Sequence, residues 1–493
     1  MTSSTAPARS SATPNYTLED WRGGYRSQPQ EFDYAITAIE GTIPVELRGT
    51  LFRNGPGLLD VEGQRLHHPF DGDGLICKFT FDQGHAHFQS RYVRSEGYVA
   101  EQTAGKILYR GVFGTQKPGG WLANAFDLRL KNIANTNILY WGDKLLALWE
   151  AAKPHRLDPQ TLQTLGLDDL DGLLGEKGAF SAHPRIDPGS EHTQGERRLV
   201  NFALEAGLSS KLHIYEFDAA GKLLQQQVRT IPGFAFIHDF ALTPNYCIFF
   251  QNPVRFNPLP FLAGFKGAAQ CIDFLTDQPT QAIIVPRDFS KPVQTVQANP
   301  CFVFHHANAF EVDEQRIVID SVCYDNLPSV EPDADFLEID FTSLAPGQLW
   351  RYELDLATQT SQRQLLVDRC CEFPSQNPAT VGQTCRYYYL GAAAQPNGNA
   401  PLQLILKYDI TTGESLVWSA APRGFISEPL FVPHPQATRE DHGWVLTLIY
   451  NAERQASDLV ILDALNLEEI ARLQLRQHIP YGLHGSFVSE VFA

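Results

Sequence analysis

The sequence predicts an all-β protein built as a seven-bladed β-propeller, and two observations carry that prediction. The first is the alternation of apolar and polar residues in segments rich in β-branched and aromatic types, which is typical of strands. Such segments occur at 212–217, 349–354, 402–408 and 444–450, while long stretches with the 3.6-residue period of a helix are scarce. The second observation is a repeated hairpin.

The repeated unit is an apolar strand end followed by Asp, a short turn and a second strand. The turn Asp falls at Asp82, Asp158, Asp218, Asp277, Asp355, Asp409 and Asp463. Hairpins repeated about every 50 to 70 residues are typical of a propeller, in which four-stranded sheets circle an axis. The unit at Asp277 is the weakest, because Thr276 stands where the others have an apolar residue. A long β-sandwich with ordinary Asp turns is the alternative.

We expect a single propeller domain over residues 15–493, because strand signals continue from about residue 35 without a linker rich in Gly, Ser or Pro. Residues 1–14 are mainly Ser, Thr, Ala and Pro, which predicts a disordered tail. Neither a secretory signal nor an apolar run of about 20 residues is present, so the sequence predicts a cytoplasmic protein without a transmembrane helix.

Charge and cysteine content exclude several classes of protein. The chain has 39 Lys and Arg against 56 Asp and Glu, a net charge of −17, which argues against a nucleic-acid partner. The eight Cys form no C-x-x-C motif, so neither a zinc knuckle nor a disulfide framework is predicted. No protein partner is indicated.

Four histidines lie in apolar or Gly/Pro-marked strand ends: His183, His238, His305 and His484. Their spacings correspond to roughly one, one and three repeats, so equivalent inner strands of a propeller would direct four imidazoles to one point on the axis. Neutral imidazole suits Fe, Cu, Ni and Zn, and four of them leave two positions open on an octahedral ion. Histidines satisfied within the core are the alternative.

Three glutamates stand in apolar surroundings: Glu150, Glu372 and Glu428. A histidine that binds a metal usually donates its other N–H to a carboxylate, which fixes the orientation of the ring. We therefore expect these glutamates to orient histidines of this group. The alternative places each of them at a strand end on the rim.

Several ordered motifs together resemble the carotenoid cleavage oxygenase family over nearly the whole chain. They are FRNGP at 52–56, HPFDGDG at 68–74, NTN at 135–137, AHPRIDP at 182–188, FIHDFA at 236–241, FHHANAF at 304–310, EP at 428–429 and LHGSF at 483–487. The resemblance implies one Fe(II) per chain on the propeller axis, held by the four histidines and oriented by the three glutamates, with O2 as co-substrate. It also implies a cap of loops and helices over the iron-bearing face, and His305 rather than His306 as the ligand.

The function that the resemblance implies is cleavage of the central 15,15′ double bond of an apocarotenal or apocarotenol, which gives retinal and a second aldehyde. A stilbene-type cleavage dioxygenase and an ester isomerohydrolase are alternatives within the enzyme class. A propeller that serves only as a binding module is the alternative outside it. The residues expected to line the substrate tunnel and the iron site are Phe70, Thr136, Trp149, Phe236, Phe304 and Tyr324.

Two unusually apolar loop segments, at 111–128 and 257–268, predict peripheral contact with a membrane surface. The residues expected to form the membrane patch are Phe113, Trp121, Leu122, Phe126, Phe261 and Phe265. The net negative charge indicates that this contact is mainly hydrophobic. Buried loops that only cap the tunnel are the alternative.

Overall fold

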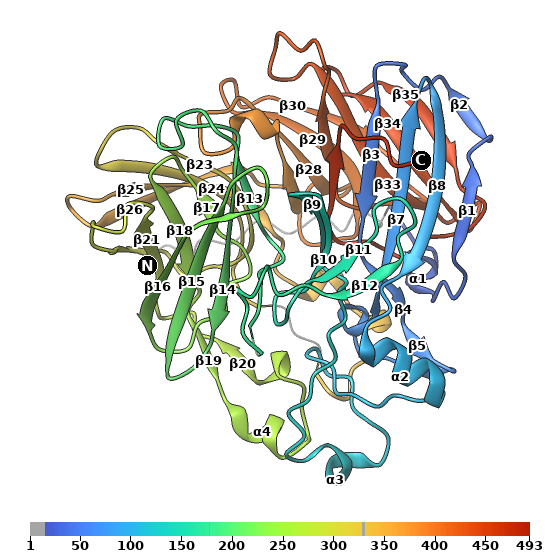
Figure 1. The fold of residues 1–493 in the computed structure, drawn as a ribbon, viewed down its shortest axis with the longest axis horizontal. Coiled ribbons are helices and arrows are strands. Elements are labelled where there is room, and N and C mark those ends of the chain that lie inside the picture. Colours follow the sequence, from blue (N-terminus) through green and yellow to red (C-terminus); the bar gives the residue numbers. More distant parts are fainter. Residues whose placement is uncertain (1–14, 177, 328–330) are drawn as a thin grey trace, which may run out of the picture.

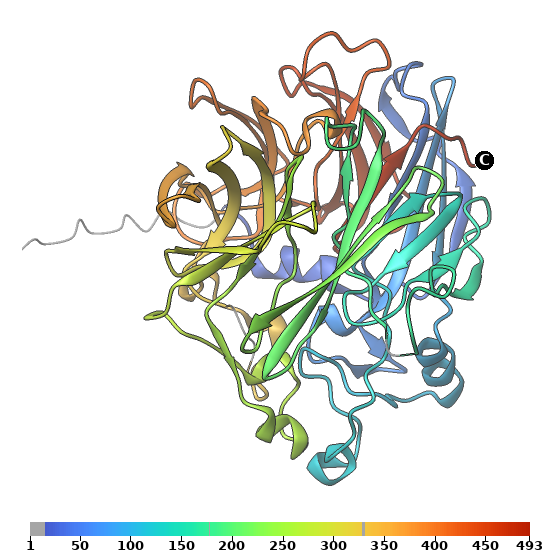
Figure 2. The same ribbon diagram turned by 60° about the vertical axis from the view of Figure 1, so that its left-hand side comes forward.

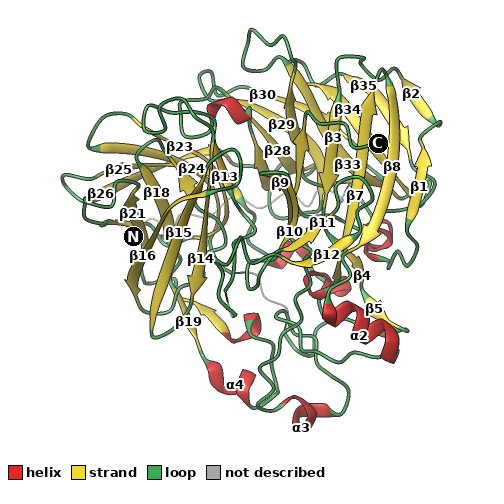
Figure 3. Ribbon diagram, viewed as in Figure 1, coloured by secondary structure: helices red, strands yellow, loops and turns green. Residues whose placement is uncertain are grey.

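The computed structural model describes residues 15–176, 178–327 and 331–493, and within them seven sheets of four or more strands surround a central axis (Figure 1). The sequence prediction of an all-β, seven-bladed propeller is confirmed. The expected tail at 1–14 lies outside the described residues. The helices are short, as the scarcity of helix-period stretches predicted, and strands dominate the fold (Figure 3).

Three of the sheets are built mainly from the first half of the chain. One contains β1 (Phe32–Ala35), β8 (His85–Tyr92), β7 (Asp73–Asp82), β3 (Gly49–Arg53) and β36 (Gly485–Val488), with β4 (Pro56–Leu58) beside β7. The next contains β12 (Thr164–Leu167), β11 (His155–Leu157), β10 (Lys144–Leu148) and β9 (Asn137–Trp141). The third contains β13 (Arg185–Asp187), β14 (Arg198–Glu205), β15 (Ser209–Phe217) and β16 (Leu223–Pro232).

The other four sheets complete the ring. The fourth sheet contains β17 (Ala241–Leu242), β18 (Tyr246–Gln251), β21 (Thr280–Pro286) and β22 (Gln294–Ala298), and the fifth contains β23 (Phe302–Glu311), β24 (Arg316–Tyr324), β25 (Gln348–Asp355) and β26 (Thr360–Val367). The sixth contains β27 (Cys371–Ser375), β28 (Tyr387–Ala393), β29 (Leu402–Asp409) and β30 (Ser415–Ser419). The seventh contains β31 (Gly424–Ile426), β32 (Leu430–Pro433), β33 (Gly443–Asn451), β34 (Ala456–Asp463), β35 (Glu469–Gln474) and β2 (Ile39–Gly41). Two small ribbons lie outside them, β5 (Asp60–Val61) with β6 (Gln64–Arg65) and β19 (Val254–Phe256) with β20 (Ile272–Phe274).

The ring is closed by strands from distant parts of the sequence. β36 pairs antiparallel with β3, and β2 pairs antiparallel with β35. Two of the seven sheets thus combine early and late segments of the chain, so both must be in place before the ring is complete.

The hydrophobic core lies between neighbouring sheets. Each of seven clusters of buried residues joins strands of two adjacent sheets, as Leu139 and Leu146 do with Leu199 and Tyr215. Because a middle strand of a blade is covered on both faces, β33 is buried along nearly its whole length. This explains why the middle strands have apolar residues on both faces.

Asp side chains cap the outer hairpin of most sheets by accepting hydrogen bonds from backbone N–H groups two or three residues further on. Asp218 accepts from Ala220 at 3.0 Å, and Asp355 accepts from Ala357 at 2.9 Å. The prediction for Asp277 was wrong: it follows β20, which pairs with β19. The corresponding hairpin joins β21 to β22, and there Asp288 accepts from the backbone N–H of Ser290 at 3.0 Å.

Segments poor in strands gather on one side of the ring (Figures 1 and 2). They include α2 (Glu96–Ala104), α3 (Gly120–Asn124) and α4 (Pro258–Leu262). Arg110 joins the segments that carry α3 and α4, since its guanidinium donates to the carbonyls of Asn124, Asp127 and Lys266. Within the described ranges, none of the helices is long and apolar enough to cross a membrane.

Candidate metal centre

Each of the seven sheets supplies one of the seven residues expected at the centre. Four of them are the histidines: His183, His238 and His484 lie just before an inner strand of a sheet, namely β13, β17 and β36, and His305 lies within β23. The other three are the glutamates: Glu150 follows β10, Glu372 lies in β27, and Glu428 lies between β31 and β32. The inner strands of neighbouring sheets contact one another around the axis, which brings these positions together.

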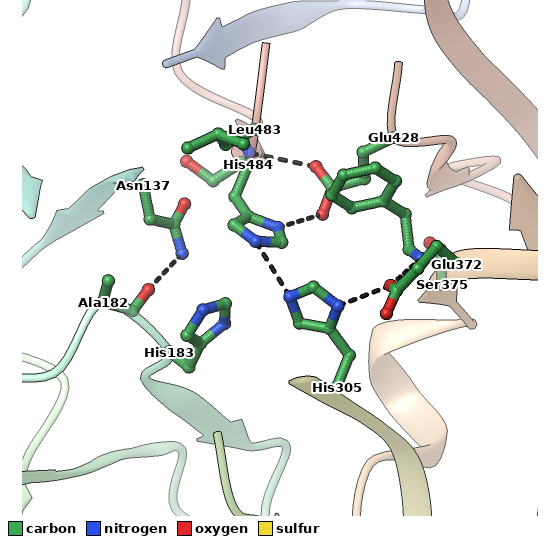
Figure 4. Close-up of polar contacts among 12 residues, drawn as sticks. Asn137, Ala182, His183, His305, Glu372, Ser375, Glu428, Leu483 and His484 are labelled. Carbon is green, nitrogen blue, oxygen red and sulfur yellow. Dashed lines mark hydrogen bonds and ion pairs between the residues drawn. The ribbon is translucent and has the colours of Figure 1, made fainter. Parts of the chain in front are cut away.

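The four imidazoles converge, with one nitrogen of each lying within 4.8 Å of the others. Nε2 of His183 is 2.8 Å from Nε2 of His238, and Nε2 of His305 is 3.1 Å from Nε2 of His484. Figure 4 shows His183, His305 and His484 pointing toward one another. This four-histidine group could hold a metal ion.

Three of the four rings are held from behind by a carboxylate. Nδ1 of His238 lies 2.7 Å from Glu150. Nδ1 of His305 lies 2.5 Å from Glu372, and Nδ1 of His484 lies 2.8 Å from Glu428 (Figure 4). These contacts place the proton on Nδ1 and leave the Nε2 lone pair directed at the axis. His183 has no such carboxylate contact among the described residues.

A cation between the facing Nε2 atoms would account for their spacing. With both protons on Nδ1, His305 and His484 present only lone pairs to each other, and such a contact is repulsive without a positive charge between them. Two nitrogens bound at about 2.0–2.1 Å to one ion, at right angles, lie about 3 Å apart. The observed separations of 2.8 and 3.1 Å match that spacing.

Burial and charge favour the neutral ring of His183 and His484 and the ionised form of two glutamates, whereas at His305 the effect of Glu372 outweighs that of burial and raises the pKa. Burial, with the neighbouring imidazoles, lowers the pKa of His183 far below its usual value, and burial also lowers the pKa of His484. Burial alone would raise the pKa of Glu428, but Arg53 and His484 hold it below its ordinary range. Burial opposes ionisation of Glu372 as well, and His305 outweighs that effect and lowers its pKa.

A cavity of about 350 Å³ adjoins this group, a size suited to a small organic ligand. Its wall is mainly apolar and aromatic and includes Trp21, Tyr25, Phe70, Phe113, Phe236, Phe304, Tyr324, Phe336, Phe341, Phe373 and Leu483. Phe304 and Phe373 connect the two features: the Phe304 ring lies 5.5 Å from that of His238, and the Phe373 ring 5.6 Å from that of His305. An apolar cavity thus ends beside the four imidazoles.

Comparison with known proteins decides the family. Residues 25–489 match the family described as retinal pigment epithelial membrane protein, and the chain is 54% identical, over 98% of both sequences, to the apocarotenoid-15,15′-oxygenase of Synechocystis sp.. The chain belongs to the carotenoid cleavage oxygenase family. It is therefore an enzyme of the oxygenase class.

More distant members of this family act on other compounds. Isoeugenol monooxygenase of Pseudomonas putida is 31% identical over 92% of this chain and 94% of its own. Resveratrol cleavage oxygenase 1 of Botryotinia fuckeliana is 28% identical over 93% and 83%. Crystal structures of the Synechocystis apocarotenoid oxygenase, one of a variant and one substituted with cobalt, match with TM-scores of 0.95, covering 97% of this chain and all of theirs.

The structure of this oxygenase separates the predicted cavity residues into two groups. Phe70, Phe236, Phe304 and Tyr324 line the cavity. Trp149 and Thr136 do not: Trp149 is buried beside a much smaller pocket behind Asp71, and the Thr136 carbonyl accepts from the His484 backbone N–H at 3.1 Å. Thr136 is thus tied to the strand end that carries His484.

His306 lies outside the four-histidine group, as the alternation of side chains along a strand requires. Its Nδ1 lies 2.7 Å from the Ser321 hydroxyl, and its ring packs edge-on against Phe250. Its backbone N–H donates to Asp239, which is buried and also binds Arg185. His306 is thus a buried core residue.

Two residues hold the glutamates through contacts that the sequence analysis did not predict. Arg53, in the FRNGP motif, donates to Glu428, and the Tyr324 hydroxyl donates to Glu372 at 3.0 Å. Arg53 and Glu428 are 375 positions apart, so only the closed ring brings them together. An Arg in a buried, Gly-rich turn was the available signal, because a buried guanidinium needs a carboxylate or carbonyl partner.

The HPFDGDG motif fastens the strand-poor segments to the propeller. Asp71 accepts from the backbone N–H groups of Phe113 and Thr115, at 2.9 and 3.1 Å. Asp73 binds Lys131 at 2.7 Å, and Lys131 also binds Glu101. The motif thereby holds the loop that carries Phe113 against the propeller.

The apolar segments form an exposed patch, with two corrections. Trp121, Leu122, Phe126 and Phe265 are 50%, 73%, 80% and 57% exposed, and the rings of Trp121 and Phe265 lie 5.7 Å apart. The prediction was wrong for Phe113, which turns inward and stacks on His68 in the cavity wall. It was also wrong for Phe261, which is buried because the Arg110 guanidinium covers its ring at 4.0 Å.

Proposed function

We propose that this protein is a non-haem Fe(II) dioxygenase that cleaves the central 15,15′ double bond of apocarotenals or apocarotenols with O2, giving retinal and a second aldehyde. The observation that carries the proposal is the apolar cavity that ends beside four converging imidazoles. The high identity to an enzyme named apocarotenoid-15,15′-oxygenase supports the choice of substrate.

The residues present fit an iron ion. His183, His238, His305 and His484 would hold it through Nε2, and Glu150, Glu372 and Glu428 would fix three of the rings. Four neutral imidazoles leave room on an octahedral ion for further ligands. When bound, iron(II) would supply the activation of dioxygen next to a conjugated double bond. The existence of a cobalt-substituted Synechocystis relative supports a metal at this place.

The chain's own residues would bind and shield the polyene. The aromatic wall excludes water and presents ring faces along the cavity, which stabilises positive charge that develops on a polyene. Phe304 and Phe373, between cavity and imidazoles, would hold the reacting bond at the centre. The carboxylates hold protons at the Nδ1 atoms and keep the rings from turning.

We also propose that residues 15–493 act as one unit in the cytoplasm and contact a membrane from one side. The exposed patch of Trp121, Leu122, Phe126 and Phe265 supports this, because a polyene partitions into lipid. Its segments belong to the same strand-poor side as the loop that lines the cavity with Phe113. Substrate would then pass from lipid to the cavity without crossing water.

The test is product analysis with iron-loaded enzyme, O2 and apocarotenals of graded length. We expect retinal together with a second aldehyde whose length varies with the substrate. The matched control is the enzyme stripped of metal by a chelator and then supplied again with Fe(II), which should lose and regain turnover. Cleavage of stilbene phenolics with no turnover of apocarotenals would contradict the proposal.

A further inference from the structure

One side chain in the aromatic wall of the cavity has a hydrogen-bonding direction that the fold fixes. His68 lines the cavity between Phe70, Phe113 and Phe336. Its ring is stacked on Phe113 with centroids 5.2 Å apart, and it meets Phe70 and Phe336 edge-on at 4.7 and 4.6 Å. Three aromatic rings thus hold the imidazole in one orientation.

The tautomer of His68 is set by the chain that follows it. Nδ1 accepts from the backbone N–H of Phe70 at 3.1 Å and caps the short 3-10 turn Pro69–Asp71. The proton therefore resides on Nε2. Burial, with a contribution from His67, lowers the pKa of His68 to about 3, so the ring stays neutral at ordinary pH. Among the described residues, no protein group accepts from Nε2.

We propose that the Nε2–H of His68 donates a hydrogen bond to the oxygen at one end of the substrate and thereby sets the register of the polyene against the four-histidine centre. This inference rests on the proposed function and deepens it. The ligand group is an oxygen acceptor, which in this class of substrate is an aldehyde carbonyl or a hydroxyl.

A directional contact is needed because a polyene is a row of similar double bonds. Apolar walls contact a chain shifted by one double bond almost as well as the correct one, so area alone does not select the bond that is cleaved. A polar group at a fixed place in an otherwise apolar cavity supplies orientation and specificity. The distance from His68 to the four-histidine centre then determines which double bond of the substrate lies at that centre.

The hydroxyl of Tyr25 is the hydrogen-bond donor in the cavity wall that competes with the Nε2–H of His68. Tyr25 lines the same cavity and packs edge-on against Phe336 at 5.1 Å, on a ring that His68 also contacts. Its O–H rotates freely about the C–O bond, so the fold does not fix its direction as it fixes that of His68. Tyr25→Phe removes this hydroxyl and serves as the comparison variant.

Two substitutions divide the functions of the imidazole. In His68→Asn, the side-chain oxygen takes the place of Nδ1, so the cap of the 69–71 turn is kept and the donor in the cavity is lost. In His68→Gln, the amide nitrogen takes the place of Nε2, so the donor is kept and the cap is lost. If the cap matters for folding, His68→Gln should be the less stable variant. If the donor sets the register of the substrate, His68→Asn should lose that register.

The experiment compares wild type and the three variants on an apocarotenal, the matching apocarotenol and a hydrocarbon analogue of equal length. We expect wild type to prefer the oxygenated substrates by about tenfold in kcat/KM and to give one pair of products. His68→Asn should lose this preference and give products of more than one length, while His68→Gln should keep the preference within about threefold. If His68→Asn lowers kcat/KM equally for the apocarotenal and the apocarotenol, the group bound by His68 is an oxygen acceptor of either kind, carbonyl or hydroxyl.

The inference is overturned if His68→Asn keeps both the preference and the single product pair, or if Tyr25→Phe abolishes them instead. A binding measurement distinguishes failure of the inference about His68 from failure of the proposed function. Trp21 lines the cavity, so quenching of tryptophan fluorescence reports polyene binding to metal-free protein. If no apocarotenoid is cleaved but the apocarotenal still binds about tenfold more weakly to His68→Asn, the function fails and the role of His68 stands. Equal binding to both proteins overturns it.

Discussion

Arg53 donates to the oxygen of Glu428 that His484 leaves free. His484 uses Oε1 of Glu428, whereas Oε2 receives Arg53 and the backbone N–H of Gly485, the latter at 3.0 Å. Arg53 also donates to the carbonyl of Leu483 at 3.0 Å. One guanidinium therefore fixes both the carboxylate that orients the His484 ring and the backbone that precedes this histidine.

Replacing Arg53 by Met should weaken folding and metal binding together. Glu428 would keep its buried charge without a cationic partner, and breaking such a pair typically costs about 3–5 kcal/mol. Urea unfolding and metal titration measure the two effects. Arg53→Lys is the matched control, because it keeps the charge and should recover part of the stability. Unchanged stability and metal content in Arg53→Met would contradict this role.

Replacing Glu150, Glu372 or Glu428 by Gln should lower metal affinity or turnover by about 10- to 100-fold, since an amide holds the imidazole less firmly than a carboxylate. Tyr324→Phe removes only the hydroxyl bond to Glu372 and should have a smaller effect. Metal analysis after dialysis checks whether the three Gln variants lose more metal than Tyr324→Phe does. Normal metal content and turnover in all three Gln variants would disprove the assignment.

The two adjacent histidines of the FHHANAF motif should respond differently. His305→Ala removes an imidazole of the four-histidine group and should abolish bound iron and turnover. His306→Ala removes a buried contact with Ser321 and Phe250 and should lower the free energy of unfolding while iron is retained. The reverse pattern, with iron lost only in His306→Ala, would show that the wrong histidine had been chosen.

Acid should destabilise the wild type more than His68→Asn. The pKa of His68 in the fold, about 3, lies below the usual value of 6.5. From pH 6.5 downward the unfolded chain therefore binds more protons at this position, and the folded state loses stability as the pH falls. The difference in unfolding free energy between the proteins should change by up to roughly 1 kcal/mol per pH unit in that range. Parallel stability curves would show that His68 titrates normally.

Changing Trp121, Leu122, Phe126 and Phe265 to Ser should reduce co-sedimentation with liposomes, because these exposed side chains supply apolar area. Added salt should have little effect on the wild type. A control with Leu165 and Leu208 changed to Ser removes exposed apolar residues outside the two segments and should bind normally. Equal binding by the four-residue variant, or binding that salt abolishes, would exclude this surface.

Local patterns in the sequence predicted the strands and the placing of the four histidines, because both follow from side-chain periodicity. The resemblance of the FHHANAF motif indicated His305 as the ligand, and the alternation of side chains along a strand then required His306 to face the other side. Phe261 and Phe265 could not be told apart: both lie in one short apolar segment, and only the Arg110 guanidinium, far away in sequence, decides which one is covered. The hairpin at Asp288 was missed because Arg287 precedes that Asp where an apolar residue was sought.

Closure of the ring gives the centre an order of assembly. Six of the seven residues precede β36 in the chain, and the seventh, His484, adjoins this strand, which must pair with β3. A nascent chain that has reached residue 480 carries three imidazoles and an open circle of blades. An ion that needs all four imidazoles could therefore be held at full strength only after the circle has closed, which couples any metal binding to the folded state of both ends of the ring.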